Sequence, residues 1–272
     1  IMAWSGVAIS SGVIFGPVLG SFLSQTNLHF KYSFWILHLD RFSVPFILVA
    51  LLGFTVLVIL IKSFRNTKPV SRFVSGKQKL NFSFSRFFIV LLLLSFVMQF
   101  VVTLFETVFS IYGKNQLLFS SNQIGIGFMV CGIVMAVLQP VFATYGEKIL
   151  TAKQQIGAGL LISGISLIAF PFFGNEIYVY VLIVTFATGG AIVTPNLLSA
   201  VSLLSKEKAG SNISVQTSAN SVGQILGPII GTWLIAGGFY YPFIIAGIII
   251  ITFIGLLYFY KSSNEKYSKI TY

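Results

Sequence analysis

One stretch of the chain carries polar side chains at a spacing that could support chemistry inside a membrane. Residues 95–112 are otherwise apolar, yet Ser95, Gln99, Thr103, Glu106 and Ser110 follow one another at intervals of four, four, three and four residues. On an α-helix this spacing places all five on one face. Glu106 is the only acidic residue that we place inside an apolar segment, where a carboxylate can carry a proton or bind a cation.

The depth of Glu106 leaves two interpretations open. Nineteen residues separate Glu106 from Arg86, which at ~1.5 Å per residue is nearly a full hydrocarbon thickness. If Arg86 marks the inner boundary, Glu106 is shallow and hydrated. If Arg86 extends to the interface or the helix is tilted, Glu106 is deeper. The polar residues on its face favour a water-filled cavity and therefore a functional role.

The composition identifies the surroundings as lipid. The chain has 272 residues, of which 56% are hydrophobic and 8% are charged, whereas soluble domains are about one quarter charged. A membrane-spanning helix needs ~20 mostly apolar residues, and eight segments meet this length. We therefore expect an all-α membrane protein with spans at 3–24, 43–61, 87–111, 123–145, 154–173, 177–198, 212–236 and 241–260.

Basic residues predict the orientation. Because successive connections alternate between the two sides of the membrane, 14 of the 17 basic residues fall on one side, which is therefore predicted to be cytoplasmic. That side holds the connection 62–86 and the C-terminal tail. We expect residues 62–86 to contact anionic lipid headgroups. A nucleic-acid partner is not expected, because no basic, aromatic-interleaved soluble fold is present.

A nine-residue pattern occurs twice and suggests an internal repeat. The pattern G-x-x-x-G-P-x-x-G comprises Gly12, Gly16, Pro17 and Gly20 in one copy, and Gly223, Gly227, Pro228 and Gly231 in the other. Glycines four apart let another helix approach closely, and we expect this contact to lie between two halves and to slide during transport. The next segments also share a beginning, Pro45-Phe46-Ile47 and Pro242-Phe243-Ile244.

The repeat predicts a six-helix unit with parallel copies. On this count the chain comprises helices 5–12 of an expected twelve. Residues 1–61 hold the last two helices of an N-terminal bundle, 62–86 a basic cytoplasmic linker, 87–260 a C-terminal six-helix bundle, and 261–272 a cytoplasmic tail.

These motifs resemble those of the major facilitator superfamily. Residues 12–20 resemble the antiporter motif of the fifth helix in drug/proton exporters, and residues 223–231 resemble its echo in helix eleven. Residues 105–112 resemble helix seven of multidrug exporters related to the quinolone efflux pumps of Gram-positive bacteria. The resemblance implies that Glu106 takes part in drug and proton handling. Some of those relatives carry a second acid in helix ten, where this chain has Ala191, so a two-carboxylate mechanism does not carry over.

Other residues extend the candidate site. Gln216 and Asn220 share a helical face with Gly223 and Gly227, and either substrate contact or helix–helix hydrogen bonding accounts for them. Phe100, Phe105 and Phe109 could stack on a flat or cationic solute. The single cysteine, Cys131, excludes an internal disulfide and a multi-cysteine metal site. No nucleophile–base pair, metal cluster or phosphate loop suggests an enzyme or a cofactor.

The sequence thus predicts a monomeric, multi-pass transporter of a bacterial plasma membrane. Its small-molecule substrates are expected to be amphipathic or cationic drugs, exported in exchange for protons by alternating access. Two alternatives remain open: an exporter of a sugar or another metabolite, or a truncated remnant that does not transport.

Overall fold

A computed structural model describes residues 32–34, 37–39, 43–64, 85–172, 174–204 and 209–259. The chain divides into two compact units, Gly16–Ser83 and a second unit that contains Phe84–Tyr272. Each unit is described by itself. The expected segment 3–24, including Gly12, Gly16, Pro17 and Gly20, lies outside the described residues, as do most of the linker and the C-terminal tail.

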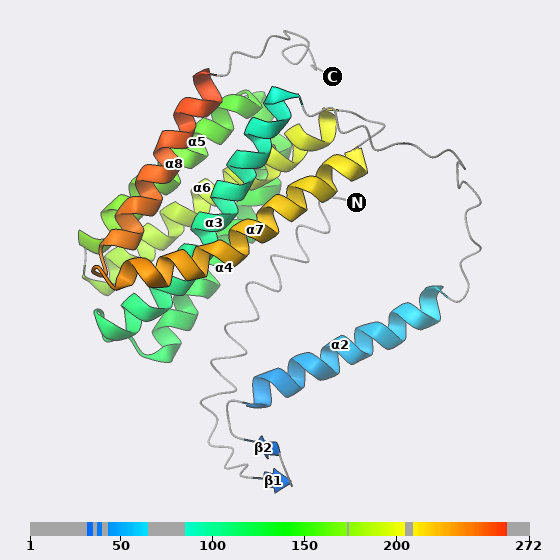
Figure 1. The fold of residues 1–272 in the computed structure, drawn as a ribbon, viewed down its shortest axis with the longest axis vertical. Helices are drawn as coiled ribbons and strands as arrows, with labels where there is room; N and C mark the ends of the chain where they lie inside the picture. Colours follow the sequence, from blue (N-terminus) through cyan, green and yellow to red (C-terminus); the bar gives the residue numbers. More distant parts are fainter. Residues whose placement is uncertain are drawn as a thin grey trace. The chain divides into compact units, whose positions relative to one another are not determined.

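The described residues of the larger unit form six α-helices (Figure 1). Short 3₁₀ turns follow two of them, at Gly146–Lys148 and Phe170–Phe172. The helices are α3 (Arg86–Asn115), α4 (Ser121–Tyr145), α5 (Ala152–Ala169), α6 (Glu176–Leu203), α7 (Ala209–Ile235) and α8 (Tyr241–Phe259).

Side-chain caps define where several helices begin. Ser120 and Gln123 form a reciprocal capping box at α4, and Thr151 and Gln154 form another at α5. Asn175 accepts a hydrogen bond from the Ile177 backbone N–H at the start of α6. These bonds satisfy N–H groups that have no partner within the helix. For the seven expected segments other than 3–24, the predicted limits agree with the described helices to within a few residues.

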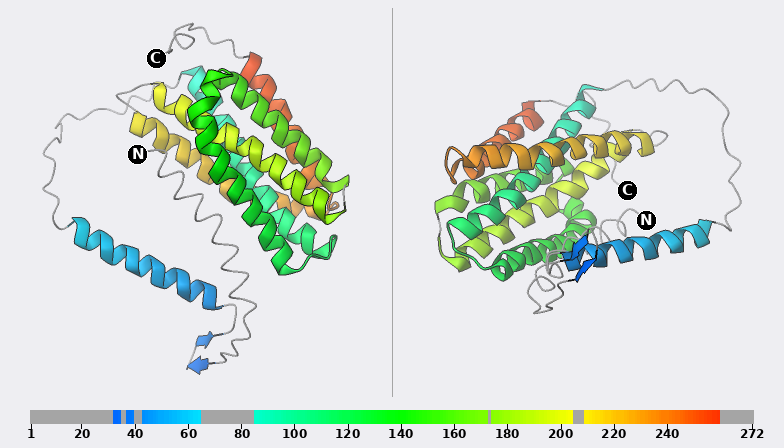
Figure 2. Two further views of the ribbon diagram at one scale, coloured as in Figure 1. Left: turned by 180° about the vertical axis from the view of Figure 1, so that it is seen from behind. Right: turned by 60° about the horizontal axis from the view of Figure 1, so that its bottom comes forward.

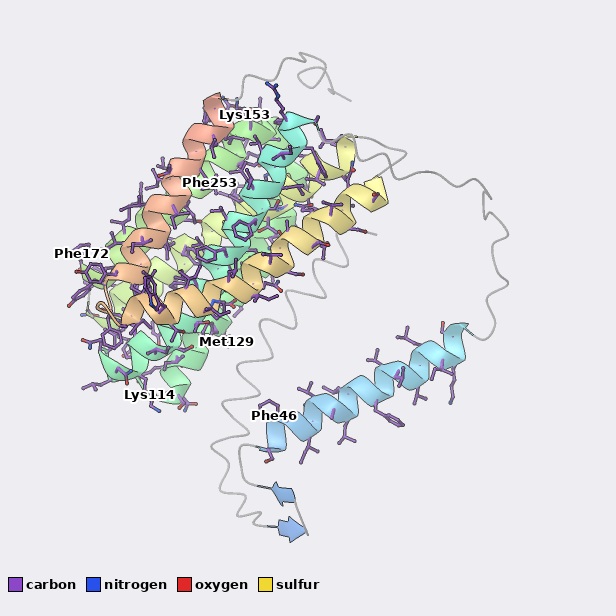
Figure 3. All side chains as sticks on the ribbon, viewed as in Figure 1. Phe46, Lys114, Met129, Lys153, Phe172 and Phe253 are labelled. Atoms are coloured by element: carbon purple, nitrogen blue, oxygen red, sulfur yellow. The ribbon has the colours of Figure 1, made fainter. Side chains whose placement is uncertain are left out.

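The bundle is organised around α3 and α6 (Figure 2). α3 packs most extensively on α7 and also on α8, whereas α6 packs on α5 and α4. The six helices form two consecutive sets of three, α3 to α5 and α6 to α8. The first helix of each set contacts the second and third helices of the other set. This exchange is the pattern expected of a six-helix unit built from two related three-helix repeats. Lys114 and Lys153 mark opposite ends of the bundle (Figure 3).

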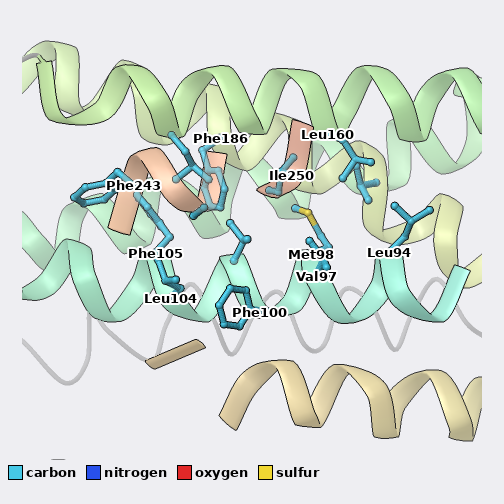
Figure 4. Packing of buried hydrophobic residues seen from close by; sticks show 14 of the residues in the cluster. Leu94, Val97, Met98, Phe100, Leu104, Phe105, Leu160, Phe186, Phe243 and Ile250 are labelled. Atoms are coloured by element: carbon cyan, nitrogen blue, oxygen red, sulfur yellow. The ribbon is translucent and has the colours of Figure 1, made fainter. Parts of the chain in front are cut away.

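Aromatic residues dominate one part of the core. Phe105 of α3 is 2% exposed and points toward Phe186 and Phe243 (Figure 4). Its ring centroid lies 4.6 Å from that of Phe186 and 5.3 Å from that of Phe170. Edge-to-face and tilted pairs of this kind add to the stabilisation from burial. The aromatic cluster therefore fixes α3 against α6 and α8.

Small residues bring α5 close to two neighbours. A methyl group on Gly159 would lie 2.8 Å from the Gly189 carbonyl oxygen of α6. Ser166 donates a hydrogen bond of 2.6 Å to the Leu182 carbonyl oxygen of the same helix. Toward α8, a methyl group on Gly247 would lie 2.7 Å from the Gly164 carbonyl oxygen. Close backbone approach is the usual way in which helices associate within membranes.

The smaller unit contains α2 (Ser43–Phe64) and a two-stranded antiparallel sheet, β1 (Tyr32–Phe34) paired with β2 (Leu37–Leu39). The strands lie between the expected spans 3–24 and 43–61, where no strand was predicted. In the register of this sheet, Tyr32 pairs with Leu39 and Phe34 pairs with Leu37.

The expected number of spans is confirmed only in part. Seven α-helices are described, and six of them are long and apolar enough to cross a membrane, not eight. The first expected span, 3–24, lies outside the described residues. The segment expected at 212–236 forms α7, but this helix is not among the six. Serine, threonine, asparagine and glutamine residues lower the hydropathy of α7, although its length is sufficient.

Candidate functional site

The length of α3 places Glu106 inside the apolar part of the helix. α3 has 30 residues and is therefore ~45 Å long, well beyond the ~30 Å of a hydrocarbon core. Centring the helix in the bilayer puts roughly residues 90–110 within that core. Glu106 then lies in the outer third of the core, about 12 Å along the axis from Lys114.

Glu106 occupies the side of α3 that faces α4. Its side chain is half-buried, and its carboxylate is near enough to the Cys131 thiol of α4 for electrostatic interaction. The adjacent Phe105 and Phe109 are buried. Among the described residues, no side chain forms an ion pair or a hydrogen bond with this carboxylate. A half-buried carboxylate in apolar surroundings can gain and lose a proton or bind a cation.

We call the row of Ser95, Gln99, Thr103, Glu106 and Ser110 on α3 the polar stripe. The end of this stripe at Ser95 is a helix–helix contact. Ser95 is 4% exposed and accepts a 2.8 Å hydrogen bond from Nε2 of Gln216 in α7. Thr103 donates to the Gln99 carbonyl oxygen at 3.0 Å, and its hydroxyl lies 3.5 Å from the Gly223 carbonyl oxygen. The stripe is therefore one face of α3 in sequence, but two environments in space: α7 covers its first part and Glu106 lies beside α4.

The glycines of the second motif copy explain how α7 packs on α3. A methyl group on Gly223 would lie 2.7 Å from the Phe96 carbonyl oxygen and 2.9 Å from the Phe100 nitrogen. One on Gly227 would collide with the Thr103 hydroxyl, and one on Gly231 would lie 3.0 Å from side-chain atoms of Leu104. The motif is a close-packing surface, as predicted.

The predicted partner of this surface requires a correction. We expected the glycine contact to lie between the two halves of the transporter. For residues 223–231 it lies inside the larger unit, between α7 and α3. The spacing of glycines identifies a face that packs closely but does not identify its neighbour.

Two amide oxygens on the same face of α7 have unusual surroundings. Gln216 Oε1 and Asn220 Oδ1 are buried without a hydrogen-bond partner among the described residues. The sequence leaves two roles open for Gln216, substrate contact and helix–helix hydrogen bonding. The structure contains a helix–helix hydrogen bond, which Gln216 donates through Nε2. Unpaired buried acceptors are costly, at about 1–3 kcal/mol each, so this part of the α3–α7 contact is not optimised for stability.

The aromatic residues near the stripe belong to the core. Phe105 and Phe109 are 2% and 0% exposed and stack on each other with centroids 5.6 Å apart. Phe100 is 7% exposed and stacks on Phe96 at 6.1 Å. The expectation that these rings could stack on a solute is therefore wrong for this arrangement, because protein side chains already cover their faces.

A buried amide pair was missed in the sequence. Gln155 of α5 accepts a 3.0 Å hydrogen bond from Asn196 of α6 and donates one to the Leu150 carbonyl oxygen at 3.0 Å. A methyl group on Gly146 would collide with the Gln155 amide. The sequence signal that could have revealed this pair is a polar residue within each of two apolar segments. The pair joins α5, α6 and the α4–α5 connection. Ala191 is fully buried in α6.

The apolar helices define the class of the protein. Six described helices are long and apolar enough to span a membrane, so the chain is a multi-pass membrane protein. The described residues contain no group of three or more histidine, cysteine, aspartate or glutamate residues that could hold a metal ion.

Comparison with known families identifies the class more narrowly. The family model of the Major Facilitator Superfamily matches residues 1–211 and 91–271. The chain therefore belongs to the major facilitator superfamily, which is a family of membrane transporters and not of enzymes.

Individual relatives are distant but cover most of the chain. Multidrug resistance protein 2 of Bacillus subtilis (strain 168) is 25% identical over 274 residues, which cover 97% of this chain and 65% of that protein. Multidrug resistance protein 1 of the same strain is 24% identical, over 96% of this chain and 64% of its own length. Quinolone resistance protein NorA of Staphylococcus aureus (strain COL) is 25% identical, over 82% and 54%. The chain thus spans less than two thirds of the length of these relatives, and the predicted resemblance to such pumps is confirmed.

Proposed function

We propose that this protein exports amphipathic, cationic compounds across the plasma membrane in exchange for protons, with Glu106 as the group that alternately binds the proton and the solute. The observation that carries the proposal is the position of Glu106: a half-buried carboxylate within the apolar part of α3, without an ion-pair partner among the described residues. Similarity to proteins named for multidrug and quinolone resistance supports the substrate class.

The coupling follows from charge. A protonated Glu106 is neutral and has little attraction for a cation, whereas the deprotonated carboxylate attracts one strongly in a medium of low dielectric constant. Proton binding and solute binding at one carboxylate are therefore mutually exclusive. Alternating access of that carboxylate to the two sides then exchanges one for the other. We also propose that the C-terminal tail and residues 62–86 lie on the cytoplasmic side of the membrane.

The test replaces the carboxylate by its neutral isostere. In inverted membrane vesicles with an imposed pH gradient, Glu106→Gln is expected to reduce gradient-driven uptake of ethidium by at least about 100-fold, because the variant can bind no exchangeable proton. Glu176→Gln, at the first position of α6 and exposed, is the matched control and should retain uptake. The amount of each variant in the membrane is measured in parallel.

Undiminished uptake by Glu106→Gln would refute the proton-carrier role. Uptake of a neutral sugar that survives in this variant would favour the alternative, export of a sugar or another metabolite.

A further inference from the structure

The end of the bundle that carries Lys153 contains two lysine–tyrosine contacts that the proposed function does not use. The Lys148 ammonium lies 5.1 Å from the centroid of the Tyr145 ring, and the Lys153 ammonium lies 5.0 Å from that of Tyr258. An ammonium over an aromatic ring is held there by electrostatic attraction. Figure 3 shows Lys153 at this end of the bundle and Lys114 at the opposite one. We call Tyr145, Lys148, Lys153 and Tyr258 the lysine–tyrosine site.

The connection between α4 and α5 keeps Lys148 close to the beginning of α5. The Gln155 side chain donates a hydrogen bond to the Leu150 carbonyl oxygen at 3.0 Å, and a methyl group on Gly146 would collide with the Gln155 amide. The Leu150 backbone N–H also donates to the Gly146 carbonyl oxygen at 3.0 Å. The connection is therefore folded onto the first turns of α5, and both lysines lie at one end of the bundle.

A glycine of α5 allows α8 to position Lys153. A methyl group on Gly157 would lie 3.0 Å from the Tyr258 hydroxyl oxygen, so the tyrosine lies directly against α5. Gly157 follows Lys153 by about one turn on the same helical face. The Tyr258 ring therefore packs beside the backbone of α5 and beneath the Lys153 ammonium. Tyr258 is still 51% exposed, which leaves the site open to its surroundings.

Both ammonium groups are available to an anion. Lys148 is exposed and Lys153 is half-buried, and neither forms an ion pair with a described side chain. Lys153 also lies in the first turn of α5, where the helix dipole disfavours a cation and favours an anion. Residues 145–155 contain two lysines and one acidic residue, Glu147, and so have a formal net charge of +1.

Apolar side chains continue from this charged site along the surface of the bundle. Ile149, next to Lys148, is 81% exposed. Leu161 and Ile165 of α5 follow Gly157 at steps of four residues and are 45% and 55% exposed. Tyrosines are also typical of the membrane–water interface. A ligand that suits this surface carries an anionic group at the helix ends and hydrocarbon along the helix sides.

We propose that the lysine–tyrosine site binds the headgroup phosphate of an anionic phospholipid, with the acyl chains along α5. Lysine ammonium groups donate charge-assisted hydrogen bonds to phosphate oxygens, and basic groups beside membrane helices attract acidic headgroups. The tyrosine rings restrict the two lysines before the lipid binds, so less side-chain freedom is lost on binding. Binding of this lipid requires neither protons nor a transported solute, and it is independent of the Glu106 proposal.

The first experiment measures phosphatidylglycerol binding to the purified, delipidated protein by native mass spectrometry. The double variant Lys148→Gln and Lys153→Gln is expected to bind phosphatidylglycerol at least about 10-fold more weakly, because two charged contacts are lost. Its affinity for phosphatidylcholine, whose headgroup has no net charge, should change less than about 2-fold. Equal losses for both lipids would overturn the proposal.

Lys114→Gln is the matched control, since Lys114 is an exposed lysine at the opposite end of the bundle. Its affinity for phosphatidylglycerol should stay within about 2-fold of that of the unaltered protein. A loss as large as that of the double variant would show that binding follows total charge and not this site. Displacement of the lipid by millimolar inorganic phosphate would identify a site for free anions and would also overturn the proposal.

The second experiment tests the sign of the charge and the role of the ring. Glu147→Gln is expected to strengthen phosphatidylglycerol binding about 2- to 5-fold, because a negative charge near the phosphate is removed. Tyr258→Leu should weaken binding about 3-fold by releasing Lys153, whereas Tyr258→Phe retains the ring and should retain the affinity. Weaker binding by Glu147→Gln would overturn the proposal, and equal losses for the two Tyr258 variants would overturn the positioning of Lys153 by the ring.

Discussion

The two ends of the polar stripe on α3 have the same sequence spacing but different surroundings. Ser95 and Thr103 lie against α7, where Ser95 is buried and receives a hydrogen bond from Gln216. Glu106 and Ser110 are half-buried, and Ser110 donates to the Glu106 carbonyl oxygen of its own helix at 3.0 Å. The comparison shows that a polar stripe can combine a packing contact with a half-buried carboxylate about one to three turns away.

The difference arises because α7 crosses α3 instead of running along it. Gly223 lies against Phe96 and Phe100 of α3, whereas Gly231 lies against Leu104 and Val108. The line of contact therefore turns around α3 and moves away from the face that carries Glu106. Helices that cross at an angle share only a limited stretch of any one face. The geometry of crossing thus separates the two ends of the stripe.

The largest effect is expected at the glycines that make this crossing possible. Gly227→Ala would place a methyl group against the Thr103 hydroxyl and 2.9 Å from the Leu104 nitrogen. Backbone atoms cannot move aside, so the free energy of unfolding should fall by about 3 kcal/mol. Thermal unfolding of the purified protein in detergent measures the change.

Gly210→Ala is the matched control for that substitution. A methyl group on Gly210 meets nothing within 4 Å, and alanine favours helix formation by up to about 1 kcal/mol relative to glycine. Its unfolding temperature should therefore stay level or rise. Equal losses for both variants would show that the α3–α7 contact is not the cause.

The next effect concerns the hydrogen bond between the side chains of Gln216 in α7 and Ser95 in α3. Ser95→Ala removes the acceptor of Gln216 Nε2 from a side chain whose Oε1 is already unpaired. The free energy of unfolding is expected to fall by about 1–2 kcal/mol, because a second buried polar group then lacks a partner.

Gln216→Leu should cost less than Ser95→Ala, although it breaks the same bond. It removes the unpaired oxygen together with the donor, and the Ser95 hydroxyl can donate to the carbonyl oxygen four residues earlier. A change within about 1 kcal/mol in either direction is expected. A double-mutant cycle measures the coupling. A loss for Gln216→Leu as large as that for Ser95→Ala would mean that Oε1 has a partner in the folded protein.

Sequence reasoning predicted the helices well and their neighbours poorly. Long apolar segments and capping residues such as Ser120 and Thr151 limit where a helix can begin and end. The face that packs closely was also recognisable, because glycines at 223, 227 and 231 have few other uses in a membrane helix. The partner of that face was not, since any neighbouring helix could accept it. For the same reason Phe105 and Phe109 were expected to be available to a solute, whereas residues distant in sequence cover them.

The candidate site shows the same limit. Glu106 was identified because a carboxylate in an apolar segment is unusual, and its position along α3 follows from helix length. The buried pair of Gln155 and Asn196 was not predicted, because an amide within an apolar segment indicates a hydrogen bond but does not identify its partner.

The smallest effect is expected from the same substitution at the far end of the stripe. Ser110→Ala removes a hydroxyl whose hydrogen bond stays within α3, so the free energy of unfolding should change by less than about 0.5 kcal/mol. Comparison with Ser95→Ala under identical conditions isolates the surroundings, because the chemical change is identical. If Ser110→Ala were as destabilising as Ser95→Ala, the outer part of the stripe would be a packing contact as well. Glu106 would then lie beside a closed interface, and the proposal that it exchanges protons and solutes would lose its structural basis.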